Sequence, residues 1–156
     1  MKNAFLIIVI LLTATSYSQR SKYKNIFEKN GNIGIGTANP DALLTVNGNI
    51  HTREVLVDLE GAVAPDYVFE NYFDGDSKLN PSYAFLTLDE VAQFIEKNYH
   101  LPGVPSALDL EEEGMSLKAM NLILLEKVEE LTLYLIEQQK EIQVLKEAIP
   151  FSKKWY

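Results

Sequence analysis

The C-terminal third of the chain carries its most regular pattern of apolar residues. Between residues 115 and 149, apolar side chains recur at alternating steps of three and four, which is the heptad repeat of a coiled coil. Ser116 is placed as a helix N-cap before the repeat, and Pro150 is placed as a stop after it. We therefore predict one long helix over 115–149, whose oligomerisation seam is formed at the d positions by Leu117, Leu124, Leu131, Gln138 and Leu145 and at the a positions by Asn121, Val128, Leu135, Ile142 and Ile149.

The heptads leave the number of strands open. Val or Ile at a with Leu at d favours dimers, whereas Leu135 at an a position relaxes that preference. Asn121 and Gln138 would fix the register at some cost in stability. The alternative is a helix that packs only within its own chain. A helix of about 33 residues is roughly 50 Å long, and we do not expect the middle of the chain to cover all of it.

Residues 32–60 read as a short, glycine-rich β region. Ile33 and Ile35 alternate with glycine, which puts both isoleucines on one face and lets another backbone approach the other face. Asn47-Gly48 is a strong hairpin signal, and the alternating residues 50–59 are predicted as the following strand. Strands this short bury little alone, so the pattern also favours an oligomer.

Residues 61–114 predict a small segment of helices and loops. Thr87 and Glu90 have the spacing of a capping box, which begins a helix expected to end near Asn98. The prolines of Leu101-Pro102-Gly103-Val104-Pro105 cannot continue it. Ser106 is then expected to cap a short helix that stops at Gly114. The predicted fold class is α+β and elongated, with the long helix at its C-terminal end.

The first 18 residues have the layout of a secretory signal peptide. Lys2 is followed by an apolar run over 5–12, and Ser16 and Ser18 stand where a cleavage site requires small residues. An uncleaved anchor is the alternative, although the run is far shorter than the roughly 20 residues that span a bilayer. We expect export to the periplasm, the cell surface or the medium, a loose linker over 19–31, and a short tail over 150–156, in which Trp155 and Tyr156 either cover the helix end or fray.

Composition narrows the classes of function. The formal net charge of −8 disfavours binding to nucleic acid, because an acidic surface repels phosphate. The absence of cysteine excludes disulfides and a lipid-modified cysteine, so an exported chain of this size must be stabilised in another way.

The residues that could carry chemistry form no convincing constellation. Gly34-Ile35-Gly36 lacks the third glycine and the following helix of a dinucleotide loop. His51 and His100 have no partner at catalytic or metal spacing, and packing is expected for His100. The acidic stretch 74–77 departs from a calcium loop at its sixth and twelfth positions. We therefore expect no catalytic, cofactor-binding or metal-binding residues, no cofactor, and no enzymatic activity.

Two blocks resemble a known family. Asn32-Ile-Gly-Ile-Gly-Thr-Ala-Asn-Pro40 and the following Leu44-Thr-Val-Asn-Gly48 resemble a unit of phage tail-fibre-like secreted bacterial proteins. The second block resembles the C-terminal module of the same proteins, and it runs through Pro65-Asp-Tyr-Val-Phe-Glu70, Leu88-Asp-Glu-Val91, His100-Leu-Pro-Gly-Val-Pro-Ser-Ala107 and Glu129-Glu-Leu-Thr-Leu-Tyr134.

The resemblance implies a trimeric fibre tip. The chain is also distantly similar to the intramolecular chaperone domain of tailspikes, in which a helical stem holds three chains in register while a β region folds. Some such domains cleave themselves with a serine and a lysine, a motif that Ser77-Lys78 and Ser116-x-Lys118 do not supply.

Together these observations predict a non-enzymatic, exported structural module that forms homo-oligomers, with the trimer favoured by the resemblance alone. A self-cleaving chaperone domain is one alternative. Another is a surface adhesin that presents aromatic side chains to a glycan or cell-surface protein, namely Tyr67, Phe69, Tyr72, Phe73 and Tyr83.

Overall fold

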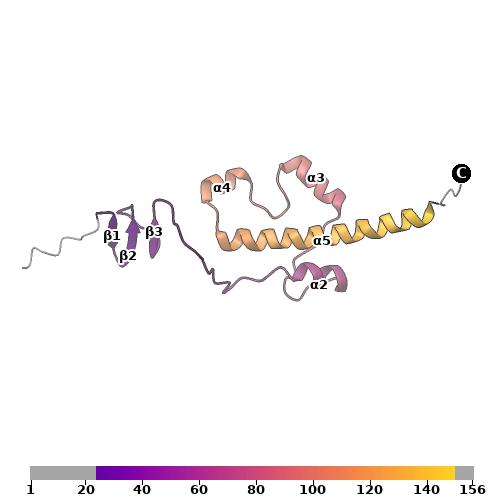
Figure 1. Ribbon diagram of the computed structural model, residues 1–156, viewed down its shortest axis with the longest axis horizontal. Helices are drawn as coiled ribbons and strands as arrows, with labels where there is room; N and C mark the ends of the chain where they lie inside the picture. The colour runs from indigo at the N-terminus through magenta and orange to yellow at the C-terminus, as the bar shows by residue number, and fades with distance from the viewer. Residues whose placement is uncertain (1–23, 150–156) are drawn as a thin grey trace, which may run out of the picture. The chain divides into compact units, whose positions relative to one another are not determined.

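The computed structural model describes residues 24–149, so the expected signal peptide (1–18) and the tail (150–156) lie outside the described residues. The chain divides into two compact units between Val55 and Leu56. Within the described residues, the first unit holds a three-stranded sheet and the second holds four helices, the last of them long (Figure 1). The α+β class and the long C-terminal helix are confirmed.

The sheet is made of β1 (Ile26–Lys29), β2 (Asn32–Ile35) and β3 (Leu44–Val46), in that order. β1 and β2 form an antiparallel hairpin closed by Asn30 and Gly31, whose φ angles of 54° and 84° are those of a type I′ turn. The expectation of a loose linker was therefore wrong for residues 26–29, because this Asn-Gly pair folds them back on β2.

The hairpin predicted at Asn47-Gly48 does not form. A type I′ turn requires a positive φ at both central residues, and Asn47 does not have one. β3 instead runs parallel to β2, with Ile33 opposite Leu44 and Ile35 opposite Val46. Residues 50–59 contain no strand in the described structure, so the strand expected there is a second error.

Gly34 explains why glycine interrupts the apolar alternation. It is buried, and a Cβ atom added to it would lie 2.2 Å from the carbonyl oxygen of Thr37. The sequence predicted that another backbone segment approaches the glycine side of this strand, and that segment is the chain's own turn after β2. Since no side chain fits there, the local path of the sheet depends on glycine at this position.

The opposite face of the sheet is apolar and largely uncovered. Cross-strand pairing places Ile26, Ile33, Ile35 and Leu44 on one face, where they are 36% to 58% exposed. Three short strands without a covered apolar face bury little surface. The first unit therefore has no hydrophobic core of its own among the described residues.

The second unit contains α2 (Tyr67–Asp74), α3 (Leu88–Asn98), α4 (Ala107–Glu113) and α5 (Leu117–Ala148). The predicted capping box of Thr87 and Glu90 is present, and α3 ends at Asn98 as expected. Ser106 and Ser116 cap α4 and α5, as predicted. Helix boundaries were predictable because caps are short-range sequence signals.

The core of the second unit forms where α2 packs on α5. α2 packs against α5, and Pro65, Val68 and Leu133 are the largest fully buried side chains of the described structure. In Figure 1, α3 and α4 follow one side of α5 and α2 follows the other. Among residues 24–149, no helix is both long and apolar enough to cross a membrane.

Substituting Gly34 by alanine tests the first unit. We expect Gly34→Ala to unfold the sheet, because the new methyl group would overlap the Thr37 carbonyl. Gly31→Ala is the control, since Gly31 has open space around it and loses only about 1 kcal/mol for its positive φ. Amide hydrogen exchange of β1 and β2 measures the effect, and equal protection in both variants would contradict it.

Candidate functional site

The predicted seam lies on one exposed face of α5. All ten residues named for it are exposed in the chain. The eight apolar members are 45% to 67% exposed, and they follow one another from the first turn of the helix to the residue after its end. An apolar stripe of this length on a single chain is a candidate interaction surface. The stripe consists of Leu117, Leu124, Val128, Leu131, Leu135, Ile142, Leu145 and Ile149.

The opposite face of α5 is already covered by the chain itself. Lys127, Glu129, Leu133 and Tyr134 are its buried residues, and they occupy the b, f and g positions of the heptad. The seam occupies a and d. The long helix therefore has two faces suited to packing, and the second unit covers only one of them.

A cluster of charged and aromatic side chains fixes the segments that pack on this face of α5. The Nζ atom of Lys127 lies 2.8 Å from Oε1 of Glu126 and 2.9 Å from Oε1 of Glu130. Tyr67, at the start of α2, donates its hydroxyl hydrogen bond to Glu126. Tyr83 donates to Glu130 at 3.0 Å. Two distant parts of the middle segment are thus bonded to adjacent turns of α5.

The cluster shifts the pKa values of its members. Burial would lower the pKa of Lys127, but the hydrogen bonds to Glu126 and Glu130 outweigh it and raise that pKa above its usual value. Burial, together with the neighbouring carboxylates, raises the pKa values of Tyr67 and Tyr83. The lysine is thus held as a cation and both tyrosines as neutral donors.

Tyr134 makes a further link one turn beyond this cluster. Its hydroxyl donates to the carbonyl oxygen of Leu86 at 2.7 Å, just before α3 begins. Its ring packs on Phe85 with the ring centres 4.8 Å apart. Burial, reinforced by nearby carboxylates, raises the pKa of Tyr134 to about 12. The link fixes the start of α3 against α5.

The proline-rich loop lies over the same ion pairs. Gly103 has a φ of 75°, and a Cβ added to it would lie 3.7 Å from Oε1 of Glu126 and 3.8 Å from Nζ of Lys127. His100 packs edge-on against Phe94, and its Nδ1 lies 3.0 Å from the carbonyl oxygen of Leu101. These contacts give His100 the packing role predicted for it.

Glu129 is the buried residue of α5 whose carboxylate is incompletely hydrogen-bonded. Only 8% of its surface is exposed, and its Oε2 atom has no hydrogen-bond partner in the described structure. Burial is the main cause of its raised pKa, and the carboxylates of Asp66 and Glu126 raise it further. A buried carboxylate without a donor destabilises the fold when it is ionised.

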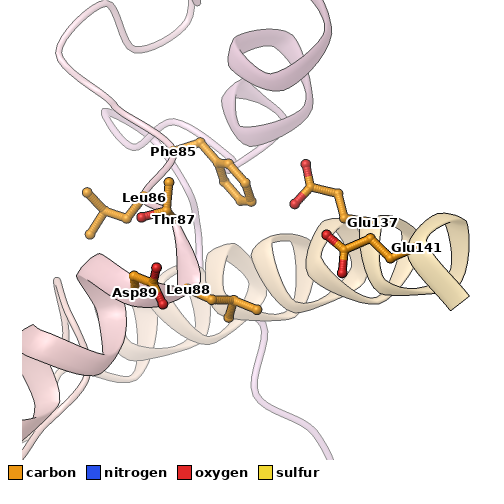
Figure 2. Close-up of a pocket in the computed structure, with 7 residues that line it drawn as sticks. All are labelled: Phe85, Leu86, Thr87, Leu88, Asp89, Glu137 and Glu141. Atoms are coloured by element: carbon orange, nitrogen blue, oxygen red, sulfur yellow. The ribbon is translucent and has the colours of Figure 1, made fainter. Parts of the chain in front are cut away.

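An open cleft lies beside the C-terminal half of α5. Figure 2 shows the ring of Phe85 on one side of it and the carboxylates of Glu137 and Glu141 on the other. The stretch from Leu86 to Asp89, at the start of α3, completes the lining. Its charged groups are all acidic, so it suits a cationic side chain better than an anion.

The described residues assemble no metal-binding group. Within residues 24–149, no three His, Asp or Glu side chains gather as a metal site. In the acidic stretch 74–77, Ser77 is buried and donates to Glu70 at 2.7 Å, and Gly75 caps the end of α2. This stretch therefore forms a helix terminus and a turn.

The aromatic residues considered for an adhesin surface do not form one patch. Tyr67 and Tyr83 pack on each other, with ring centres 5.0 Å apart, and both are bonded to α5. Phe73, at 71%, is the exposed member of the set, and Tyr67 to Phe73 lie on α2. Sequence reasoning missed the cluster around Lys127, whose one local signal is the Lys127–Glu130 spacing.

Comparisons with protein-family models, with curated proteins and with solved structures find no match to this chain.

Removing the central cation tests the cluster. We expect Lys127→Met to destabilise the second unit by roughly 2–3 kcal/mol, because two partly buried carboxylates would lose their counter-ion. Lys140→Met is the matched control, since Lys140 is exposed on the same helix. Chemical denaturation followed by circular dichroism measures both. Equal stability of the two variants would exclude a structural role for the cluster.

The raised pKa of Glu129 predicts a pH dependence. The folded protein holds this proton more tightly than the unfolded chain does, so ionisation above the folded-state pKa costs stability. We expect Glu129→Gln to be more stable than the unmodified chain by about 1 kcal/mol at pH 7. The difference should shrink as the pH falls towards the ordinary glutamate value of about 4.3.

Thermal denaturation at a series of pH values measures this effect. Glu137→Gln serves as the control, because Glu137 is exposed on the same helix. A destabilising Glu129→Gln substitution at pH 7 would show that the carboxylate has a donor after all.

Proposed function

We propose that this protein is an exported structural module that joins copies of its own chain through α5 and has no catalytic role. The observation that carries the proposal is the apolar stripe on the exposed a and d positions of a helix whose other face is already covered. The stripe has the heptad period, and that period makes it complementary to a second copy of itself.

The seam has the size and chemistry of a coiled-coil interface. Helix α5 has 32 residues, which corresponds to about 48 Å of helix. Burying the exposed part of each of its leucine, isoleucine and valine side chains stabilises an oligomer by on the order of 1 kcal/mol per residue. Asn121 and Gln138 interrupt the apolar stripe, and such polar seam residues favour one register over the others.

A role in assembling the β region follows from the same account. Within residues 24–149 the apolar face of the sheet is uncovered, and its strands are three or four residues long. Bringing copies together through α5 raises the effective concentration of these sheets for one another. We propose three copies, on the resemblance to tail-fibre-like secreted proteins, with the helices holding the chains while the β regions fold.

An aromatic binding tip is the weaker candidate. It requires several of the tyrosine and phenylalanine rings between 67 and 83 to face a ligand together. Tyr67 and Tyr83 instead donate hydrogen bonds into α5, and Phe85 packs on Tyr134. Packing on α5 thus accounts for Tyr67 and Tyr83, two of the five rings that this candidate would need.

Two neighbouring residues of α5 provide a matched test. Leu145 is a seam residue that is 61% exposed, and Val144 is off the seam and 65% exposed. Leucine is a better helix former than valine or aspartate, so Leu145→Asp costs about half a kcal/mol more in helix propensity than Val144→Asp does. We expect Leu145→Asp to weaken association by at least about 100-fold, because it places a charge in an apolar interface, and Val144→Asp to leave association nearly unchanged.

Concentration-dependent melting of helicity, for the chain from Gln19 onwards, measures both variants. The proposal predicts that the melting temperature of the unmodified chain and of Val144→Asp rises with protein concentration. Equal effects of the two substitutions on association would contradict the assignment of the seam.

A further inference from the structure

Two charged residues near the end of α5 are placed for a partner outside the chain. Glu141 and Lys146 are exposed and occupy the g and e positions that flank the seam. Neither forms an ion pair within residues 24–149, where the ion pairs belong to Lys127. Side chains at e and g of neighbouring helices are the ones that meet across a coiled coil and set its orientation.

We propose that Glu141 of one copy pairs with Lys146 of the next, and that this ion pair selects the parallel, in-register arrangement of α5. The inference rests on the proposed function and deepens it. In a parallel coiled coil, a g residue faces the e residue five positions later on its neighbour. Glu141 and Lys146 have that spacing and opposite charges, and they are the only g and e residues of α5 that combine both properties.

The surroundings of Glu141 favour a cation at this position. Glu141 lines the cleft shown in Figure 2 together with Glu137 and Asp89. The cleft therefore presents negative charge beside the seam, at the level where the neighbouring helix would bring its lysine. The ammonium group of Lys146 meets favourable potential from Glu141 and from the acidic wall behind it.

The antiparallel alternative satisfies the seam less well. The antiparallel alignment that keeps the two polar seam residues together places Asn121 opposite Gln138 and Leu117 opposite Ile142. Leu145 would then lie opposite Gly114, which precedes α5 in the partner copy. That arrangement leaves the last apolar turn of the seam without a helix to pack on, and it separates Glu141 from Lys146.

A charge-reversal cycle in the full chain tests the pair. We expect Glu141→Lys and Lys146→Glu each to weaken association by about 10-fold at low salt, because each brings like charges together. The double variant restores the opposite charges and should return the affinity to within about 3-fold of the unmodified chain. Glu147→Lys is the control, since it makes the same change in net charge at an f position, away from the seam, and should not rescue Lys146→Glu.

Orientation is read independently from a single introduced cysteine. The chain has no cysteine of its own, so Leu145→Cys can form a disulfide only between copies. Parallel, in-register helices bring the two sulfur atoms together, and oxidation should give covalent dimers on a denaturing gel. The antiparallel alignment keeps them far apart.

The outcomes separate this inference from the function on which it rests. An oligomer with no rescue in the double variant, or with no crosslink at residue 145, overturns the ion pair and the parallel arrangement but leaves self-association in place. A chain that stays monomeric at all concentrations overturns both.

Discussion

The long helix α5 has more apolar surface than the rest of the described structure covers, and the account of this protein depends on this imbalance. Residues 57–114 form enough structure to pack on the b, c, f and g positions of its first half. They leave the a and d positions in water from Leu117 to Ile149. A single chain cannot close both faces, because a helix of this length extends well beyond a segment of about 50 residues. We propose that this exposed face packs on the same helix of a second copy.

The buried cluster decides which face of α5 is left for that helix. Lys127 binds Glu126 and Glu130, while Tyr67 and Tyr83 bring the start of α2 and the segment before α3 to the same two carboxylates. Ion pairs and hydrogen bonds are directional, so they orient the cover more strictly than apolar contacts alone would. The energetic cost of desolvating these charges is offset by nearly complete pairing, with Glu129 as the exception.

The capped helices and the long C-terminal helix could be predicted from the sequence because their signals are local or strictly periodic. Thr87, Ser106 and Ser116 cap the helices they were expected to cap, and the heptad positions lie on one exposed face. The sheet was less predictable, because the chain contains two Asn-Gly pairs. The hairpin turn was predicted at the pair 47–48. The pair at 30–31 closes the hairpin, since it has a strand on each side that can pair.

Other features could not be predicted from the sequence. In the cluster around Lys127, hydrogen bonds join Tyr67 to Glu126 and Tyr83 to Glu130, which are separated by 59 and 47 positions in the sequence. Neither residue spacing nor helix propensity encodes such distant contacts. The unpartnered oxygen of Glu129 likewise depends on which groups happen to surround it. In contrast, the close approach at Gly34 could be predicted, because a glycine within an alternating apolar strand indicates that another backbone segment lies near.

The central claim is that the exposed seam of α5 is buried between copies of this chain. Sedimentation equilibrium of the unmodified chain from Gln19 onwards, across a wide range of concentrations, tests it most directly. The account predicts a reversible transition from one chain mass to three as the concentration rises. A mass of one chain at every concentration, with the full helical content of α5 retained, would contradict it.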